Sequence, residues 1–259
     1  MSSSASLQIS DDPEDLLSSF REHVAEDLQV LATLHDREPD AMLLQQLRAV
    51  DFPSSLTLLP DTEPGIEAMT LVQQALSALS TNPNQEILDE LAADYASIYL
   101  NHNISASPEE SVWLDEDSLM CQQSMFQVRS WYESHGLEIP DWRLRPDDHL
   151  VYELQFIAFL LKRDEQMETL EKTATFMDEH LLRWLGNFGE RVLVRCDTPY
   201  FAGIAALTAA YCEELRDILA EVLQQSRPSR EEIEERMQPK QPQPEAIPVS
   251  FTPGMGPVV

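Results

Sequence analysis

The stretch RPDDHLVYELQF, residues 145–156, places a proline, two acids and a histidine directly before a strongly apolar segment. Proline suits the first turn of a helix, where its missing N–H costs no hydrogen bond, and the helix dipole favours acidic side chains there. The stretch therefore predicts a helix that begins near Pro146. An ordinary helix start does not require a histidine between an acid pair and an apolar run, so Asp147, Asp148 and His149 are also candidate functional residues.

The apolar side chains after this start recur at spacings of three and four residues. Leu150, Leu154, Ile157 and Leu161 form one stripe, which apolar side chains at 156, 159 and 160 broaden. A helix with so broad an apolar face is usually surrounded by other helices. We expect this helix at the centre of a multi-helix bundle.

The same periodicity predicts helices along most of the chain. Besides the central helix, they are expected at 13–36, 39–51, 66–79, 84–100, 117–135, 166–195 and 199–226. The chain has only 7 glycines, no sustained alternation of apolar and polar residues and no Asn-Gly or Asp-Gly pair, which argues against sheets. The predicted fold class is all-α, in one helical domain over residues 13–226.

Other segments lack this periodicity. Residues 53–65 are expected to form a loop, and 101–115, which contain Pro108, form an irregular segment long enough to bind a ligand. Residues 1–12 are predicted to be a disordered N-terminus. Prolines accumulate beyond residue 226, so we expect 227–259 to be a flexible tail in which Arg230 to Met237 add a short charged helix.

The formal net charge of −29, from 46 acids against 17 bases, excludes several ligand classes. Nucleic acids and acidic membranes bind basic surfaces, so neither is an expected partner. A negative field attracts a basic peptide, although an acidic surface also serves simply to keep a protein soluble. The charge therefore favours a basic partner without requiring one.

Location and chemistry are bounded by what the sequence lacks. The cysteines Cys121, Cys196 and Cys212 lie far apart, which predicts neither a disulfide framework nor a zinc site. No export signal or membrane-spanning segment is recognisable, so a soluble cytoplasmic protein without membrane insertion is expected. Hydrolase, nucleotide-binding and metal motifs are absent, and adjacent residues such as Asp148 and His149 seldom form a catalytic pair. We expect neither catalytic activity nor a bound metal.

Several short strings occur in a fixed order between roughly residues 94 and 215. They are DY at 94–95, Pro108 with SVWLD at 111–115, VRSWY at 128–132, HGL at 135–137, PDDH at 146–149, ELQF at 153–156, EHLLRWL at 179–185, PYF at 199–201 and LT at 207–208. In this order they resemble one family, the TorD/DmsD/NarJ-type redox-enzyme maturation chaperones.

The resemblance implies an all-helical TorD-like bundle that acts in the cytoplasm. Such a chaperone binds the twin-arginine signal peptide of a molybdenum enzyme's catalytic subunit and delays export until the cofactor is inserted. The family's leader-binding acid–histidine pair falls on Asp148 and His149, and its proline loop falls on Pro108. This chain has Glu109-Glu110 where some members carry an aromatic residue, so no apolar peptide contact is implied there.

The resemblance leaves two properties open. Some members bind guanine nucleotides or the molybdopterin guanine dinucleotide cofactor weakly, but no residue here locates such a site, and no required cofactor is expected. Some members exchange helices between protomers, with residues 101–115 as a conceivable hinge, so monomer and dimer are both compatible with the sequence.

The chemistry of such a leader leads to the same region. A leader joins a basic stretch to an apolar one, so its receptor needs carboxylates beside an apolar groove. The acids expected there are Asp147, Asp148, Glu109, Glu110, Asp115, Glu116 and Asp117, with Trp113 and Phe156 in the groove. The predicted peptide-binding residues are Asp148, His149, Asp147, Pro108, Trp113 and Glu153. The alternative for Asp148 and His149 is a capping acid and a surface histidine.

One stretch of the sequence also indicates which enzyme the chaperone would serve. Residues 141–151, DWRLRPDDHLV, resemble members that accompany formate dehydrogenases more than those that serve trimethylamine N-oxide or dimethyl sulfoxide reductases. The alternative function is that of a helical adaptor or regulatory protein that binds another partner through the same groove. An enzyme that uses Asp148 and His149 is a further alternative, which would have to show turnover.

Overall fold

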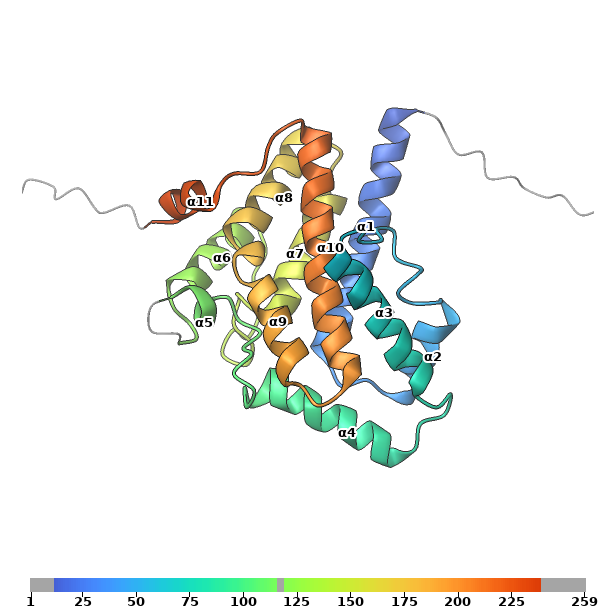
Figure 1. Cartoon of the computed structure of the whole chain (residues 1–259). Helices are drawn as coiled ribbons and strands as arrows, with labels where there is room; N and C mark the ends of the chain where they lie inside the picture. Colours follow the sequence, from blue (N-terminus) through green and yellow to red (C-terminus); the bar gives the residue numbers. More distant parts are fainter. Residues whose placement is uncertain (1–11, 116–118, 239–259) are drawn as a thin grey trace, which may run out of the picture. The chain divides into compact units, whose positions relative to one another are not determined.

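The computed structural model describes residues 12–115 and 119–238. Contacts within the chain divide it into two units, residues 1–227 and 228–259. The described residues form helices and no strand, with one isolated bridge between Glu109 and His149 (Figure 1). The predicted all-α class is confirmed.

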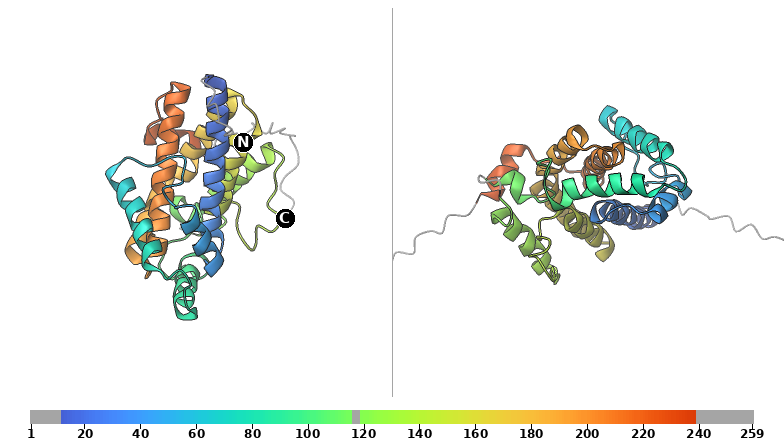
Figure 2. Two further views of the ribbon diagram at one scale, coloured as in Figure 1. Left: turned by 90° about the vertical axis from the view of Figure 1, so that its right-hand side faces the viewer. Right: turned by 90° about the horizontal axis from the view of Figure 1, so that it is seen from below.

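The first unit is a bundle in which α7 (Leu150–Arg163) and α10 (Pro199–Leu223) are central. Helix α7 packs against α1 and α8, and α10 packs against α3, α8 and α9 (Figure 1). The view from below in Figure 2 shows α4 across one end of the bundle. The remaining elements of this unit are α1 (Pro13–Asp36), α2 (Ala41–Ala49), α3 (Glu63–Ala78), α4 (Gln85–Tyr95), η1 (Ala96–Leu100), α5 (Ser111–Leu114), α6 (Gln123–Ser134), α8 (Met167–Glu179), η2 (Leu181–Arg183) and α9 (Leu185–Arg195).

The predicted stripe of α7 is buried. Leu150, Leu154, Ile157 and Leu161 are each at most 1% exposed. Burying a leucine or isoleucine side chain contributes about 1.5–3 kcal/mol relative to leaving it in water. The prediction that this helix lies at the centre of the bundle is confirmed.

Short polar side chains fix the starts of the early helices. Asp12 caps α1, Asp40 caps α2, Thr62 caps α3 and Asn84 caps α4, each accepting a hydrogen bond from a backbone N–H of the first turn. Such caps satisfy donors that have no partner inside the helix. Gly136 follows the C-terminal end of α6 and has a φ of 73°, which confirms the predicted left-handed conformation there.

The predicted start of α7 is wrong by four residues. The helix begins at Leu150, and Pro146 lies outside it. The reason is a pairing with a distant segment: the N–H of Glu110 donates to the carbonyl of Asp148, and the N–H of Leu150 donates to the carbonyl of Pro108. His149 bridges to Glu109, and residues 146–149 form a turn closed by a hydrogen bond from the N–H of His149 to the carbonyl of Pro146, which lies outside the helix.

The predicted single helix over 166–195 is also wrong. It is divided into α8, η2 and α9, and the break lies at His180, whose φ and ψ are −125° and −87°. His180 leaves the helical conformation while its side chain is held in the interior by Glu110. A tertiary contact therefore overrides an apolar pattern that continues through the break.

Other elements also differ from the prediction. The segment 101–115 contains the short helix α5, and 96–100 form a π-helix after α4. The helix predicted over 117–135 begins only at Gln123, because Cys121 has a positive φ of 61° and 119–122 are not helical. The acids Glu116 and Asp117 lie outside the described residues.

The second unit contains α11 (Arg230–Met237), which confirms the predicted short charged helix. Its start is a capping box, in which Ser229 accepts from the N–H of Glu232 and the Glu232 carboxylate accepts from the N–H of Ser229. The predicted tail from Pro239 onward and residues 1–11 of the predicted N-terminus lie outside the described residues.

None of the helices within residues 12–115 and 119–238 has both the length and the apolar character needed to cross a bilayer.

Candidate peptide-binding site

Two segments far apart in the sequence pair at the site that the sequence analysis indicated. Residues 108–111 and 147–150, together called the clasp, are joined by hydrogen bonds of 3.0 Å from Glu110 N to Asp148 O and 2.8 Å from Leu150 N to Pro108 O. Glu109 and His149 form an antiparallel bridge between them. The clasp thus brings Pro108 together with the Asp147–His149 triplet.

Asp148 joins the two halves of the clasp through its side chain. Its Oδ2 accepts a 2.8 Å hydrogen bond from the N–H of Ser111, the first residue of α5. The residue is fully buried, and burial raises the pKa of its carboxyl group. Asp148 is therefore an internal cap for α5, not an acid presented to solvent.

His149 is the N-cap of α7. Its Nδ1 accepts a 3.1 Å hydrogen bond from the N–H of Val151, and the residue is 4% exposed. Burial lowers the pKa of the imidazole well below its ordinary value, so the ring is neutral and Nδ1 is free to accept. This position satisfies one of the unpaired donors at the start of the central helix.

Asp147 already holds a guanidinium group. Its carboxylate oxygens accept from Nε and Nη2 of Arg129 at 3.2 and 2.9 Å. The Arg129 guanidinium lies 5.2 Å from the ring of Phe126 and 5.1 Å from the ring of Trp142. Because the Arg129 side chain is 24% exposed and Phe126 is 52% exposed, this end of the clasp reaches solvent.

Two further buried acids are Glu110 of the clasp and Glu153 in the first turn of α7. The carboxyl group of Glu110 is 3.1 Å from Nδ1 of His180, and Glu153 accepts a 3.3 Å hydrogen bond from the indole N–H of Trp184. Burial raises the pKa of Glu110 and of Glu153 well above the ordinary value, and the charge of Glu110 raises that of Glu153 further. Both groups are thus held in a region that favours their neutral forms.

The outer side of the 101–115 segment is held by α9. The guanidinium of Arg191 lies 4.4 Å from the ring centre of Trp113 and donates to the carbonyl of Ser105 at 2.9 Å. The indole N–H of Trp113 donates to the carbonyl of Ser107 at 2.8 Å, and Arg195 donates to the carbonyl of Ile104 at 3.0 Å. Trp113 is only partly buried, so one part of its ring remains accessible.

The structure brings the predicted residues together but places most of them inside. Pro108, Asp147, Asp148 and His149 form the clasp, Glu153 lies below it, and Trp113 lies at its outer side. All but Trp113 are buried. Asp115, also named by the sequence, is partly buried and accepts a hydrogen bond from Ser124.

The partners of these acids are not evident from the sequence. Phe156 is 3% exposed and packs against Phe176 and Trp131, so it belongs to the core and does not line an open groove. Arg129 pairs with the buried Asp147, and His180 contacts the buried Glu110. Nothing in the local sequence indicates either pairing. The only available signal was that Arg129 and His180 belong to two of the strings quoted for the resemblance.

Within the described part of the chain, no group of three or more His, Cys, Asp or Glu side chains is arranged to hold a metal ion. Among the described residues, two buried polar atoms of the clasp, Oγ of Ser111 and Oδ1 of Asp148, have no hydrogen-bond partner.

The chain is similar to known proteins over most of its length. A family model described as nitrate reductase delta subunit matches residues 64–190, which include the whole clasp. The chain is 31% identical over 199 residues to the chaperone protein TorD of Psychrobacter sp. (strain PRwf-1), covering 74% of this chain and 89% of that protein. Proteins of the same name from Vibrio vulnificus (strain YJ016) and Vibrio cholerae serotype O1 (strain ATCC 39541 / Classical Ogawa 395 / O395) are 25% and 26% identical over 205 and 218 residues. These alignments cover 76% and 81% of this chain and 94% and 98% of the relatives.

Proposed function

Because this chain belongs to the TorD family of redox-enzyme maturation chaperones, we propose that it assists assembly of a molybdenum-containing oxidoreductase. In this proposal it acts in the cytoplasm, binds the catalytic subunit and its twin-arginine leader, and delays export until the cofactor is inserted. Residues 141–151 favour a formate dehydrogenase as the client. The chaperone itself carries out no catalysis, in keeping with the names of its relatives, and needs no cofactor of its own.

The observation that supports a leader site at the clasp is the Arg129–Asp147 pair. It is a guanidinium–carboxylate pair with an exposed edge, flanked by the aromatic side chains of Phe126 and Trp142. A leader arginine approaching from solvent would take the place of Arg129 on Asp147, and its apolar stretch would contact Phe126. Arginine suits this exchange because its planar fork binds a carboxylate through two hydrogen bonds.

The other predicted residues then have distinct roles. Asp148, His149, Pro108 and Glu153 are positioning residues, because they hold the clasp through buried contacts and do not face solvent. Trp113 is a direct contact for the apolar part of the leader, since its ring is partly accessible at the outer side of the clasp.

The first experiment is capture of client from native cytoplasm on the full chain, with mass spectrometric identification. Recovery of a molybdoenzyme catalytic subunit is expected, and its identity decides between formate dehydrogenase and other clients. Recovery of no molybdoenzyme would contradict the proposal.

The second experiment is calorimetry with the synthetic leader of the captured subunit. Replacing both arginines by glutamine should weaken binding by at least tenfold, and Asp147→Asn should do so to a similar extent. The matched control is Glu86→Gln, which removes an exposed acid of α4 that is not part of the clasp. Affinity that is indifferent to both arginines would instead indicate the adaptor function. Loss of leader binding with Glu86→Gln would show that the effect is general charge, not a site.

A further inference from the structure

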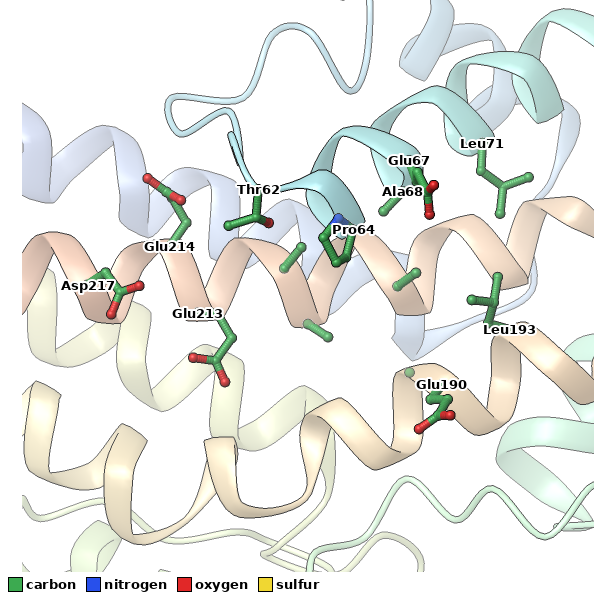
Figure 3. A pocket seen from close by; sticks show the side chains of 14 residues that line it. Thr62, Pro64, Glu67, Ala68, Leu71, Glu190, Leu193, Glu213, Glu214 and Asp217 are labelled. Atoms are coloured by element: carbon green, nitrogen blue, oxygen red, sulfur yellow. The ribbon is translucent and has the colours of Figure 1, made fainter. Parts of the chain in front are cut away.

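A groove lies along α9 on residues other than Arg191, which contacts Trp113. It is a groove of about 700 Å³ between α3, α9 and α10 (Figure 3). Its floor is made of small and apolar side chains, so the backbone of α10 is covered by little more than methyl groups. The apolar lining residues are Pro64, Ala68, Leu71, Leu193, Ala206, Ala209 and Ala210.

The rim of this groove is acidic. Glu213, Glu214 and Asp217 lie toward one end, and Glu67 and Glu190 lie toward the other (Figure 3). No basic side chain lines the groove. The pKa of Glu214 is raised by partial burial and by the nearby charges of Asp61 and Asp217, which shows an excess of negative charge at this end.

One arginine of the chain itself shows what the rim binds. The Nη1 of Arg227 lies 2.7 Å from a carboxylate oxygen of Glu213 and 3.0 Å from one of Asp217. Across the described ranges, no ion pair is formed by Glu67, Glu190 or Glu214. Part of the rim is therefore neutralised by a resident guanidinium, and the rest is available.

We propose that this groove is a docking site for a basic amphipathic helix of a partner protein. The apolar face of that helix would lie on the alanine floor, and its lysines or arginines would reach the carboxylates at both ends. From Ala206 to Asp217 the floor extends about 16 Å along α10, at roughly 1.5 Å per residue, which is the length of about three helical turns. Small side chains on the floor let a helix approach closely, as in helix-in-groove recognition.

Other occupants fit less well. A second copy of this chain carries a formal net charge of −29, so it would bring further negative charge to an acidic rim. Residues 239–259 contain one lysine and one glutamate, so this segment has no net basic charge to match the acidic rim. The proposal does not depend on the clasp, because Arg191 of α9 faces Trp113 whereas Glu190 and Leu193 line the groove.

The test uses the full chain and a synthetic helix of about 14 residues, with alanine and leucine on one face and lysine on the other. A second peptide carries glutamate at each lysine position. The basic peptide should bind, more weakly at high ionic strength, and the acidic peptide should not. Equal binding of the two peptides would overturn the proposal.

Variants on the rim give effects of opposite sign. Glu67→Gln with Glu190→Gln should weaken binding of the basic peptide about fivefold or more, since two exposed ion pairs of roughly 0.5 kcal/mol each are lost. Arg227→Gln should strengthen binding severalfold, because it frees the carboxylates of Glu213 and Asp217. Unchanged affinity in both variants would contradict docking at this rim.

Two controls separate the groove from general charge and from self-association. Glu86→Gln with Glu90→Gln on α4 removes the same charge from another exposed helix face and should leave affinity unchanged; an equal loss would overturn the proposal. Ala210→Trp fills the groove and should abolish peptide binding. If it instead converts a dimer to a monomer in light scattering, the groove belongs to a second copy. Thermal melting of each variant verifies folding, and the Asp147→Asn variant should bind the basic peptide normally.

Discussion

The carboxyl group of Glu110 lies 3.1 Å from Nδ1 of His180, a residue 70 positions later in the chain, and neither side chain is more than 1% exposed. Burial raises the pKa of Glu110 and lowers that of His180 to about 3. Burial thus favours the neutral forms of both groups. This contact ties the clasp to the break between α8 and η2.

We expect Glu110→Ala to lower the free energy of unfolding by about 3 kcal/mol, because it leaves His180 unpaired and opens a cavity. Glu110→Gln keeps a polar partner of similar size and should cost about 1 kcal/mol. Urea unfolding followed by circular dichroism measures both values. Equal losses in the two variants would show that the contact with His180 contributes nothing specific.

Glu109 should make stability depend on pH. Burial raises the pKa of Glu109 from 4.5 to about 7. A hydrogen bond from Ser107 and the charge of Arg145 lower this pKa, whereas the charge of Asp148 raises it further. Nδ1 of His102 lies 4.0 Å from the Glu109 carboxylate. A carboxyl group with a raised pKa holds more protons in the folded state than in the unfolded state. Its contribution therefore favours folding at low pH and is lost as the pH rises from about 4.5 to 7.

The measurement compares the wild type with Glu109→Gln, which cannot titrate. The unfolding free energy of the variant relative to wild type should increase from pH 5 to pH 8 by up to about 3 kcal/mol. A comparison is needed because the lowered pKa values of His35 and His180, both about 3, make the wild type more stable as the pH rises toward 6.5. Parallel curves for the two proteins would contradict the shift at Glu109.

Asp148 and His149 should affect the clasp differently. Asp148→Ala removes the acceptor for the Ser111 N–H in a buried position, so we expect a loss of about 2–3 kcal/mol. His149→Ala removes only a helix cap, at a cost of about 1 kcal/mol. Helical circular dichroism of the folded proteins should be unchanged, and leader binding should weaken in both through displacement of the clasp. His149→Ala is expected to be the more stable of the two variants. If it binds the leader as tightly as the wild type does, the clasp is not part of the leader-binding site.

The elements that the sequence predicted well are those specified by local pattern. The stripe of Leu150, Leu154, Ile157 and Leu161 and the short acidic helix at Arg230–Met237 need only their own residues to be recognised. The start of α7 and the break at His180 could not be found this way. Both depend on residues 108–111, which are 38 or more positions away in sequence, and a tertiary contact of that kind overrides local propensity.

The site shows the same division. The sequence indicated which residues come together at the clasp, but not that Asp147, Asp148 and Glu110 are buried. Acid residues are usually exposed, so a sequence predicts them on the surface unless their partners are known. Those partners, Arg129, Ser111 and His180, come from other segments. The groove over α10 was missed because its floor is alanine, which gives no strong pattern.

Gly203 should set the distance between α3 and α10. A Cβ at this position would lie 2.8 Å from Cγ2 of Val72 and 3.1 Å from its backbone nitrogen. Because backbone atoms cannot move aside cheaply, Gly203→Ala should destabilise the protein by about 2 kcal/mol. Gly186→Ala on α9 is the matched control, because an added Cβ at this position would meet no neighbouring side chain or distant backbone within 4 Å. Alanine also has the higher helix propensity, so the free energy of unfolding should increase by up to about 1 kcal/mol. Thermal and urea unfolding of the two variants should therefore shift in opposite directions. Equal shifts would mean that Gly203 contributes only its backbone flexibility, and that close packing of α3 on α10 does not fix the width of the groove between them.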